Sequence, residues 1–462
     1  MGRPTVYASL DIGTTSIKVV VAEYVNDKMN IIGVGNEPSE GVSRGVIVDI
    51  DKTVTAIKRA VEQAERKSNC QISNVIVGVP ANQVHIDPCY GMVAVSGEDG
   101  KITDYDVEQV LKAAQIKAVP QEREIISIVP EEFFIDGYGD IHDPRNMLGV
   151  RLELYANMAT GAKTIIHNIK RSVTEAGLNI ADLVVAPLAM GATALSKSER
   201  QFGTILLDLG GGQSSASVIH EQELKFFTTD LEGGEYVTKD ISTVLNTTME
   251  NAERLKLEYG FASSKDTSEE EMVPVEVIGK KEPVPVDEHY LSEIIEARCV
   301  QILETLKRSL DQVEAFDLPG GVVITGGAAA LPRMEELAQE IFNTDVRFYT
   351  PDYVGLRNPI FTTAIGLIQY THELEDVYRV TKGNDYDNSS RERYDESAYR
   401  RPVTRPEPQV EKTTEAKPAQ TTTVKPTAKT TQPKKDQQAK DDSRGQGSFS
   451  ERISNFFKDI FN

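Results

Sequence analysis

The stretch Ile205-Leu-Leu-Asp-Leu-Gly-Gly-Gly-Gln-Ser-Ser-Ala-Ser217 decides the fold expected of this chain. An apolar strand is predicted to end at Asp208, three glycines follow, and small hydroxylated residues begin a return strand. Glycine at such a turn allows positive φ and carries no Cβ, so a ligand can approach the backbone closely. Successive backbone N–H groups at Gly210, Gly211 and Gly212 would form a concave anion site. Because Asp208 would repel a bare phosphate, we expect its carboxylate to face a magnesium ion or a water molecule.

A second stretch of the same design is Leu10-Asp-Ile-Gly-Thr-Thr-Ser-Ile-Lys18. Here too a predicted strand ends in Asp-x-Gly, the chain turns through small polar residues, and an apolar run returns. Asp11 and Asp208 are 197 positions apart, which predicts two related halves that close on one ligand. Either loop alone also fits an ordinary glycine hairpin turn. Together with a third glycine turn, Gly326-Gly327, the two loops indicate a phosphate-binding cleft.

Further strands and helices are predicted around these loops. Residues 31–34 and 45–48 are expected to extend the first sheet. The pattern of apolar residues changes at residues 82–161, where strand-like runs surround one helix. This segment is predicted to form an inserted subdomain without phosphate chemistry of its own. Two helices rich in small residues, one at 188–195 and one that starts at Asn358, are predicted to cross closely between the halves and act as a hinge.

Composition restricts the class of protein. Of 462 residues, 26% are charged and 39% hydrophobic, as in ordinary soluble proteins. The sequence shows no secretory pattern, and no apolar run approaches the ~18 residues of a membrane span. Three widely spaced cysteines argue against a disulfide framework and for a reducing cytoplasm. The six histidines form no His-x-x-x-His pair, so no transition-metal site is expected.

The net charge of −21 is unevenly distributed. Residues 402–447 hold nine Lys or Arg against six Asp or Glu, and residues 448–462 hold two of each, so residues 1–401 carry −24. A body this acidic is a poor electrostatic match for nucleic acid, and no nucleic-acid partner is expected. An anionic lipid surface would also repel it.

The end of the sequence combines two segments of opposite character. Residues 383–447 are rich in Thr, Pro, Lys and Gln and are predicted to be a disordered linker that spans roughly 40–50 Å. Residues 448–462 instead predict an amphipathic helix, with large apolar residues at Phe449, Ile453, Phe456, Phe457, Ile460 and Phe461. We expect this helix to lie in the plane of a membrane surface, although docking on the body or in a groove of another protein is an alternative. One such helix binds reversibly and an array binds tightly, so self-association could gate membrane attachment.

The order of these features resembles the actin superfamily, which includes actin-like filament proteins, DnaK-type chaperones and sugar kinases. Along the chain the features are the Asp11 loop, a small-faced helix, the Asp208 loop, Glu253 with Lys256, Gly326-Gly327 and a second small-faced helix. Within this superfamily, the insert at 82–161 with its Asp143-Pro-Arg run, and the terminal apolar helix, resemble the FtsA family of bacterial cell-division proteins. The resemblance covers roughly residues 1–380 and the last fifteen.

The resemblance implies an α/β fold, namely an actin-like two-lobed ATPase fold with an inserted subdomain. Lobe I would comprise residues 1–81 and 162–200, interrupted by the insert at 82–161. Lobe II would comprise residues 201–382 and contain a smaller subdomain at about 230–310.

The resemblance also implies ATP with magnesium between the lobes. The residues that would hold phosphates are Gly13, Thr14, Thr15 and Lys18 from lobe I and Gly210, Gly211 and Gly212 from lobe II. Asp11 and Asp208 would order the magnesium ion and its waters. Glu253 and Lys256 would contact the ribose, although their spacing of three also fits an ordinary ion pair on a helix. The glycines that would complete the nucleotide site, the last two on the adenosine side, are Gly234, Gly326 and Gly327.

Turnover of the nucleotide is expected to be weak or absent. In related chaperones and filament proteins, a glutamate before the proline of the first small-faced helix positions the attacking water. This chain has Ala186 at that place, so one candidate general base is missing. No catalytic residue is assigned, and Asp208 is the best candidate for positioning water or magnesium.

By the same resemblance, the protein would polymerise, tether the tubulin-like FtsZ ring to the cytoplasmic face of the membrane at the division site, and help recruit later division proteins. The C-terminal peptide of FtsZ would dock on the subdomain at about 230–310, where Arg298 would pair with its acidic residues. The insert would contact neighbouring subunits. The alternative function is a small-molecule kinase of the glycerol-kinase type, whose loops Asp-x-Gly-Thr-Thr-Ser also resembles, although a kinase has no evident use for the apolar terminal helix. A chaperone would lack its substrate domain.

Overall fold

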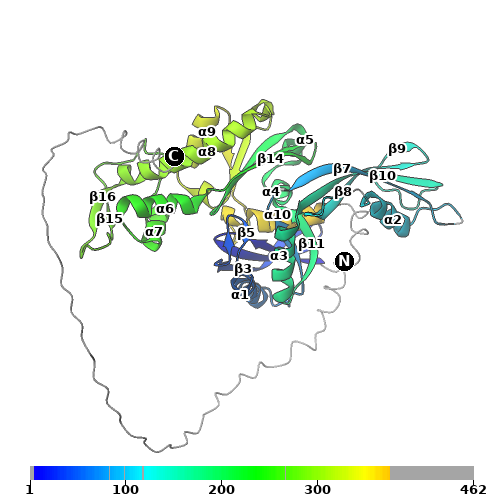
Figure 1. The fold of residues 1–462 in the computed structure, drawn as a ribbon, viewed down its shortest axis with the longest axis horizontal. Coiled ribbons are helices and arrows are strands. Elements are labelled where there is room, and N and C mark those ends of the chain that lie inside the picture. Colours follow the sequence, from blue (N-terminus) through cyan, green and yellow to red (C-terminus); the bar gives the residue numbers. More distant parts are fainter. Residues whose placement is uncertain (1–4, 83, 98, 117–118, 266, 375–462) are drawn as a thin grey trace, which may run out of the picture. The chain divides into compact units, whose positions relative to one another are not determined.

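The computed structural model describes residues 5–82, 84–97, 99–116, 119–265 and 267–374 (Figure 1). Within these ranges the chain forms two five-stranded sheets, one four-stranded sheet and two small hairpins. Among the helices of the described residues, none combines the length and the hydropathy that a membrane span requires. The predicted linker at 383–447 and amphipathic helix at 448–462 lie outside the described residues.

Lobe I is built on a sheet of strand order β11-β6-β1-β2-β3. Its strands are β1 Thr5–Ile12, β2 Ser16–Val25, β3 Lys28–Pro38, β6 Asn74–Val79 and β11 Asn179–Val185. Alternate residues of β2 enter opposite cores: Val19 and Val21 pack with helices α1 (Ile50–Ser68) and α3 (Lys163–Glu175), whereas Val20 packs with α10 (Thr362–Glu373). Because helices cover both faces, the strands are apolar on both sides.

Lobe II repeats this arrangement with the order β14-β13-β12-β17-β18. Its strands are β12 Thr204–Leu209, β13 Ser214–His220, β14 Glu223–Asp230, β17 Val322–Thr325 and β18 Val346–Phe348. In each lobe the first three strands form an antiparallel meander. On the other side of the first strand, two further strands lie parallel to it. The predicted two related halves are therefore confirmed.

Further helices and one hairpin of lobe II surround its sheet or extend from it. These elements are α5 Lys197–Phe202, α6 Gly234–Leu245, α7 Met249–Tyr259, β15 Met272–Val275, β16 Val284–Asp287, α8 Glu288–Asp311 and α9 Met334–Phe342. The apolar stripe of α8 packs into the core of lobe II, together with α6 and α7. In Figure 1, α6, α7, α8 and the β15–β16 hairpin lie together at one end of the lobe.

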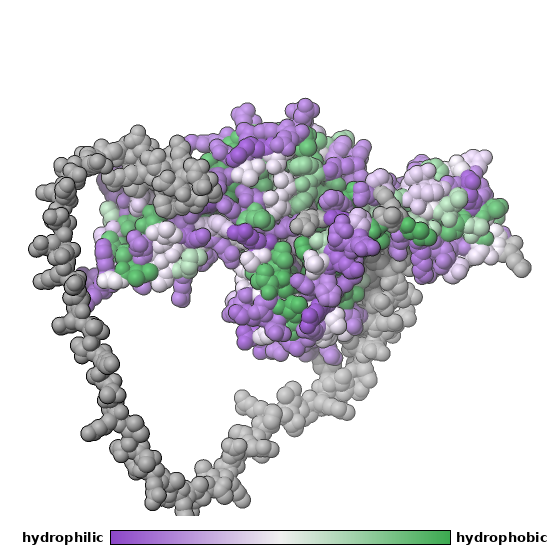
Figure 2. Space-filling view, in the orientation of Figure 1, coloured by the Kyte–Doolittle hydropathy of each residue, from purple (hydrophilic) through white to green (hydrophobic). Residues whose placement is uncertain are grey.

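The inserted segment forms its own antiparallel sheet of order β7-β10-β8-β9. Its elements are β7 His85–Ala94, α2 Asp104–Ala114, β8 Arg123–Ile135, β9 Tyr138–Ile141 and β10 Arg151–Ala162. Helix α2 covers one face of this sheet over a separate apolar core. The other face exposes Tyr90, Met92 and Tyr155. Figure 2 shows pale and green patches side by side over the insert.

One strand prediction is wrong. Residues 45–48 do not extend the first sheet: β4 (Val42–Ser43) and β5 (Val46–Ile47) pair only with each other. The cause is a tight closure in which the N–H groups of Val48 and Asp49 donate to the carbonyl of Gly41, which turns the chain directly into α1. The hairpin β4–β5 therefore stands apart from the sheet, with Arg44 at its tip.

The two small-faced helices cross with their backbones in contact. Helix α4 (Ala186–Ala194) meets α10 at Gly366, where a Cβ would lie only 2.0 Å from the carbonyl oxygen of Ala189. Across the same region, the Ser9 hydroxyl of lobe I donates to the carbonyl of Ala364 at 2.6 Å. The predicted close crossing is observed, and its action as a hinge stays a prediction.

Candidate functional site

The β1–β2 and β12–β13 turns face each other across a cleft and touch. A Cβ on Gly211 would lie 2.3 Å from Cγ2 of Thr15, and one on Gly212 would lie 2.4 Å from Cγ2 of Thr14. Only glycine permits this approach of the two loops. Both loops line a cavity of about 130 Å³, which also reaches Gly326 and Gly327.

Two carboxylates and one buried cation lie at the floor of this cavity. Lys18 is 6% exposed, and its Nζ lies 3.2 Å from Oδ2 of Asp11. Burial and then the charge of Asp11 raise the pKa of Asp208 to about 7, although Lys18 opposes the shift. Among the described residues that line the cavity, Lys18 is the one cation beside the two carboxylates, a donor set that suits a hard divalent cation.

Gly326 brings the end of β17 against the same floor. Its φ is +98°, and a Cβ at this position would lie 2.4 Å from Oδ1 of Asp208. A side chain here would be strained and would displace the carboxylate, so the third glycine turn positions Asp208 as well as lining the cavity.

Helix α6 is attached directly to the second glycine loop. The N–H of Gly234 donates to the carbonyl of Gly210 at 2.9 Å, and the N–H of Glu235 donates to that of Gly211 at 2.8 Å. A Cβ on Gly233 would lie 2.6 Å from both of these carbonyl oxygens. Two backbone hydrogen bonds therefore fix the start of α6 to this loop.

Glu253 and Lys256 line a second, larger pocket of about 860 Å³. The ammonium of Lys256 is occupied within lobe II: its Nζ lies 2.7 Å from Oε2 of Glu253, 3.0 Å from the carbonyl of Gly234 and 2.8 Å from the hydroxyl of Thr238. Lys256 thus fastens α7 to α6, and the half-exposed Glu253 carboxylate faces the pocket.

Residues that the sequence analysis missed connect distant parts of the chain around this pocket and around the smaller cavity. The guanidinium of Arg44, at the tip of the β4–β5 hairpin, donates to the hydroxyl of Tyr236 on α6. Beside it, Nδ2 of Asn82 donates to Oε1 of Gln213 at 2.7 Å. The only sequence signal for Thr238, which bonds both Glu253 and Lys256, is its helical spacing from Gly234.

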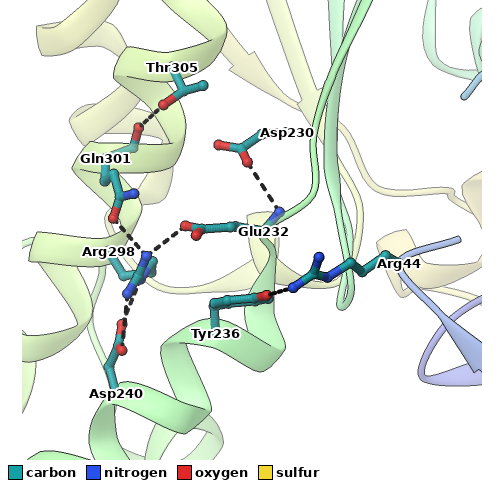
Figure 3. A network of polar contacts seen from close by, with 8 residues as sticks. All are labelled: Arg44, Asp230, Glu232, Tyr236, Asp240, Arg298, Gln301 and Thr305. Atoms are coloured by element: carbon teal, nitrogen blue, oxygen red, sulfur yellow. Dashed lines mark hydrogen bonds and ion pairs between the residues drawn. The ribbon is translucent and has the colours of Figure 1, made fainter. Parts of the chain in front are cut away.

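Arg298 lies in a buried ionic network on α8, shown in Figure 3. It is 4% exposed; its Nε and Nη2 reach the two carboxylate oxygens of Asp240 at 2.6 and 3.1 Å, and its Nη1 lies 2.6 Å from Glu232 and 2.7 Å from Gln301. Three polar partners thus already occupy the guanidinium that was predicted to pair with an acidic peptide.

The structure brings Asp11, Asp208 and the glycine loops together, and it places no carboxylate at the start of α4. Ala186 and Pro187 line the cavity there. The predicted membrane-binding residues belong to 448–462 and lie outside the described residues.

Comparison with known proteins agrees with this architecture. Residues 205–366 match the family model described as "Cell division protein FtsA", and residues 81–160 match the model "SHS2 domain inserted in FTSA". Relatives named "Cell division protein FtsA" include one from Enterococcus hirae, 55% identical over 382 residues that cover 83% of this chain and 86% of the relative. Another, from Bacillus subtilis, is 45% identical over 370 residues, which cover 80% of this chain and 84% of the relative.

Two solved structures share the fold at low sequence identity. The "PilM-PilN type IV pilus biogenesis complex" aligns with a TM-score of 0.54 and 16% identity, covering 80% of this chain and 98% of that one. MreB 5 of Spiroplasma citri bound to AMPPNP aligns with a TM-score of 0.51 and 12% identity, covering 84% of this chain and 99% of that one. At these identities the likeness concerns the fold alone.

Proposed function

The chain belongs to the FtsA family of cell division proteins, and from this premise we propose that it binds ATP with magnesium between its two lobes. The observation that carries the proposal is the pair of touching glycine loops above Asp11 and Asp208. The donor set fits the ligand: backbone N–H groups favour phosphate oxygens, and the two carboxylates favour a hydrated magnesium ion. The pocket of about 860 Å³ beside them has room for the nucleoside.

Different residues would bind the phosphates, the metal and the nucleoside. Gly13, Thr14, Thr15 and Lys18 would hold the phosphates from lobe I, and the glycines 210–212 would hold them from lobe II. Asp11 and Asp208 would order the metal and its waters. Glu253 would face the ribose, while Lys256 and Gly234 fix the helix ends around it and Gly327 lines the pocket on the adenosine side.

We predict that Asp208→Asn weakens binding of Mg-ATP by at least about 10-fold, because it removes one of two charges that balance the metal. Calorimetric titration measures this affinity, with Asp51→Asn as the control, since Asp51 is an exposed residue of α1.

Steady-state ATP hydrolysis should stay far below that of an active chaperone, because Ala186 offers no general base. A wild-type chain without affinity for Mg-ATP would overturn the proposal.

We further propose that the protein polymerises and tethers FtsZ to the inner face of the cell membrane at the division site. The C-terminal peptide of FtsZ would dock near Arg298 on α8, and the insert, with exposed Tyr90, Met92 and Tyr155, would contact neighbouring subunits or later division proteins. Membership of a cell-division family argues against the kinase alternative.

Removal of residues 448–462 is expected to abolish sedimentation of the protein with vesicles that contain anionic lipid. The physical reason is that six large apolar side chains on one helical face bury their surface in the lipid interface. A matched control keeps the composition but permutes these fifteen residues so that the apolar face is lost. Equal sedimentation of the wild type and the truncated chain would contradict membrane tethering by this segment.

A further inference from the structure

The ring of Tyr236 is surrounded by three cations that come from three elements. The guanidinium carbons of Arg44 and Arg298 lie 5.8 and 5.7 Å from the ring centre, and Nζ of Lys239 lies 5.7 Å from it. Arg44 also donates a hydrogen bond to the Tyr236 hydroxyl. Figure 3 shows Tyr236 between Arg44 of lobe I and the Arg298 network. One side chain therefore contacts both the opposite lobe and the buried ionic network.

Arg44 is fixed to the glycine loop of lobe I. The N–H of Gly45 donates to the hydroxyl of Thr14 at 3.0 Å, and Nδ2 of Asn82 donates to the carbonyl of Arg44 at 3.4 Å. The hairpin tip is consequently attached to the β1–β2 turn through Thr14.

Tyr236 is fixed to the glycine loop of lobe II, because it lies in the first turn of α6. The N–H groups of Gly234 and Glu235 donate to the carbonyls of Gly210 and Gly211. The separation of Arg44 from Tyr236 therefore depends on whether the two loops are closed or apart.

Arg298 lies on the other side of the Tyr236 ring. Its planar guanidinium is confined between this ring, the Asp240 carboxylate and the Glu232 carboxylate. Glu232 immediately precedes the glycines that begin α6, so one of these carboxylates also moves with the loop of lobe II. An acidic peptide that seeks Arg298 must compete with both carboxylates.

We propose that Arg44 and Tyr236 form a clasp through which closure of the cleft controls the access of an acidic peptide to Arg298. With the loops closed, Arg44 holds the Tyr236 hydroxyl, and the ring keeps Arg298 in its pairs with Glu232 and Asp240. With the loops apart, the ring is released and the guanidinium can turn toward the peptide. The inference rests on the proposed binding of nucleotide and peptide, and it makes the two binding events mutually unfavourable.

The test measures the affinity of a synthetic FtsZ C-terminal peptide for the full chain, with and without a saturating, non-hydrolysable ATP analogue and magnesium. In the wild type, the analogue is expected to lower the affinity for the peptide by about 5-fold or more. By linkage, the peptide should lower the affinity for the analogue by the same factor. Tyr236→Phe removes only the hydroxyl, and Arg44→Ala removes its partner. Either variant should bring the factor close to 1, and the double variant should add nothing further.

Lys239→Ala is the matched control, because Lys239 lies over the same ring but belongs to α6 and does not cross the cleft. It should retain the wild-type factor. A wild-type factor of 1, or a factor that survives both Tyr236→Phe and Arg44→Ala while both ligands bind, would overturn the clasp and leave the proposed function intact. Failure of the wild type to bind either ligand would instead refute the proposed function, and the clasp with it.

Discussion

Arg298→Glu is expected to destabilise the protein by about 3–5 kcal/mol, the cost of leaving a buried ionic network uncompensated. The wild-type guanidinium satisfies Asp240 with two hydrogen bonds and Glu232 with one, at 4% exposure. The substitution would place a third carboxylate beside these two with no cation between them. Urea unfolding followed by far-ultraviolet circular dichroism measures the shift of the transition.

The matched control is the same substitution on the same helix at Arg308, which is exposed and whose Nε bonds only the carbonyl of Glu304 among its described hydrogen bonds. Arg308→Glu should cost less than about 1 kcal/mol. Equal unfolding midpoints for the two variants would show that the Arg298 network does not stabilise lobe II. Peptide binding by Arg298→Glu is therefore measured at a temperature at which circular dichroism shows this variant to be folded.

Gly366→Ala is expected to destabilise the protein by about 2–3 kcal/mol. In an ordinary helix interior, in contrast, replacement of glycine by alanine stabilises the helix. The new Cβ would lie 2.0 Å from the carbonyl oxygen and 2.5 Å from the carbonyl carbon of Ala189, both of them backbone atoms that cannot rotate away. Helices α4 and α10 must then separate. The midpoint of urea unfolding should fall, and affinity for Mg-ATP should fall with it because α4 also lines the cleft through Ala186.

Gly191→Ala on the facing helix is the control for this prediction. There the new Cβ would meet Cδ1 of Ile219 at 2.5 Å, the mobile end of a side chain. We expect a change of less than about 1 kcal/mol, since a rotamer shift relieves the contact. If the two alanine variants unfold alike, the backbone contact at Gly366 is not tight in solution.

The fold could be predicted from the sequence where its signals are local. An Asp-x-Gly run at the end of an apolar strand marks each loop, and the repetition of this pattern at Asp11 and Asp208 marks the two halves. The hairpin β4–β5 could not be assigned correctly, because its short apolar pairs look like any edge strand. In the structure, two successive N–H groups, those of Val48 and Asp49, donate to the carbonyl of Gly41 and turn the chain into α1.

The two loops of the site could also be predicted, because their sequence signals are local. The contact between Arg44 and Tyr236 could not. Arg44 and Tyr236 are 192 positions apart, and no spacing or motif connects them. The burial of Arg298, in contrast, had a signal that was missed. It follows Ile295 by three positions and precedes Ile302 by four, which puts it on the apolar stripe of α8 that packs into the core of lobe II.

Helix α10 is the last element of the described chain, yet its apolar residues Ala364, Ile365 and Leu367 pack with β1, β2 and β6 of lobe I. A terminal membrane anchor would therefore pull on lobe I, whereas an FtsZ peptide near Arg298 would pull on lobe II. A load applied between these two proposed attachments would act across the cleft between the lobes.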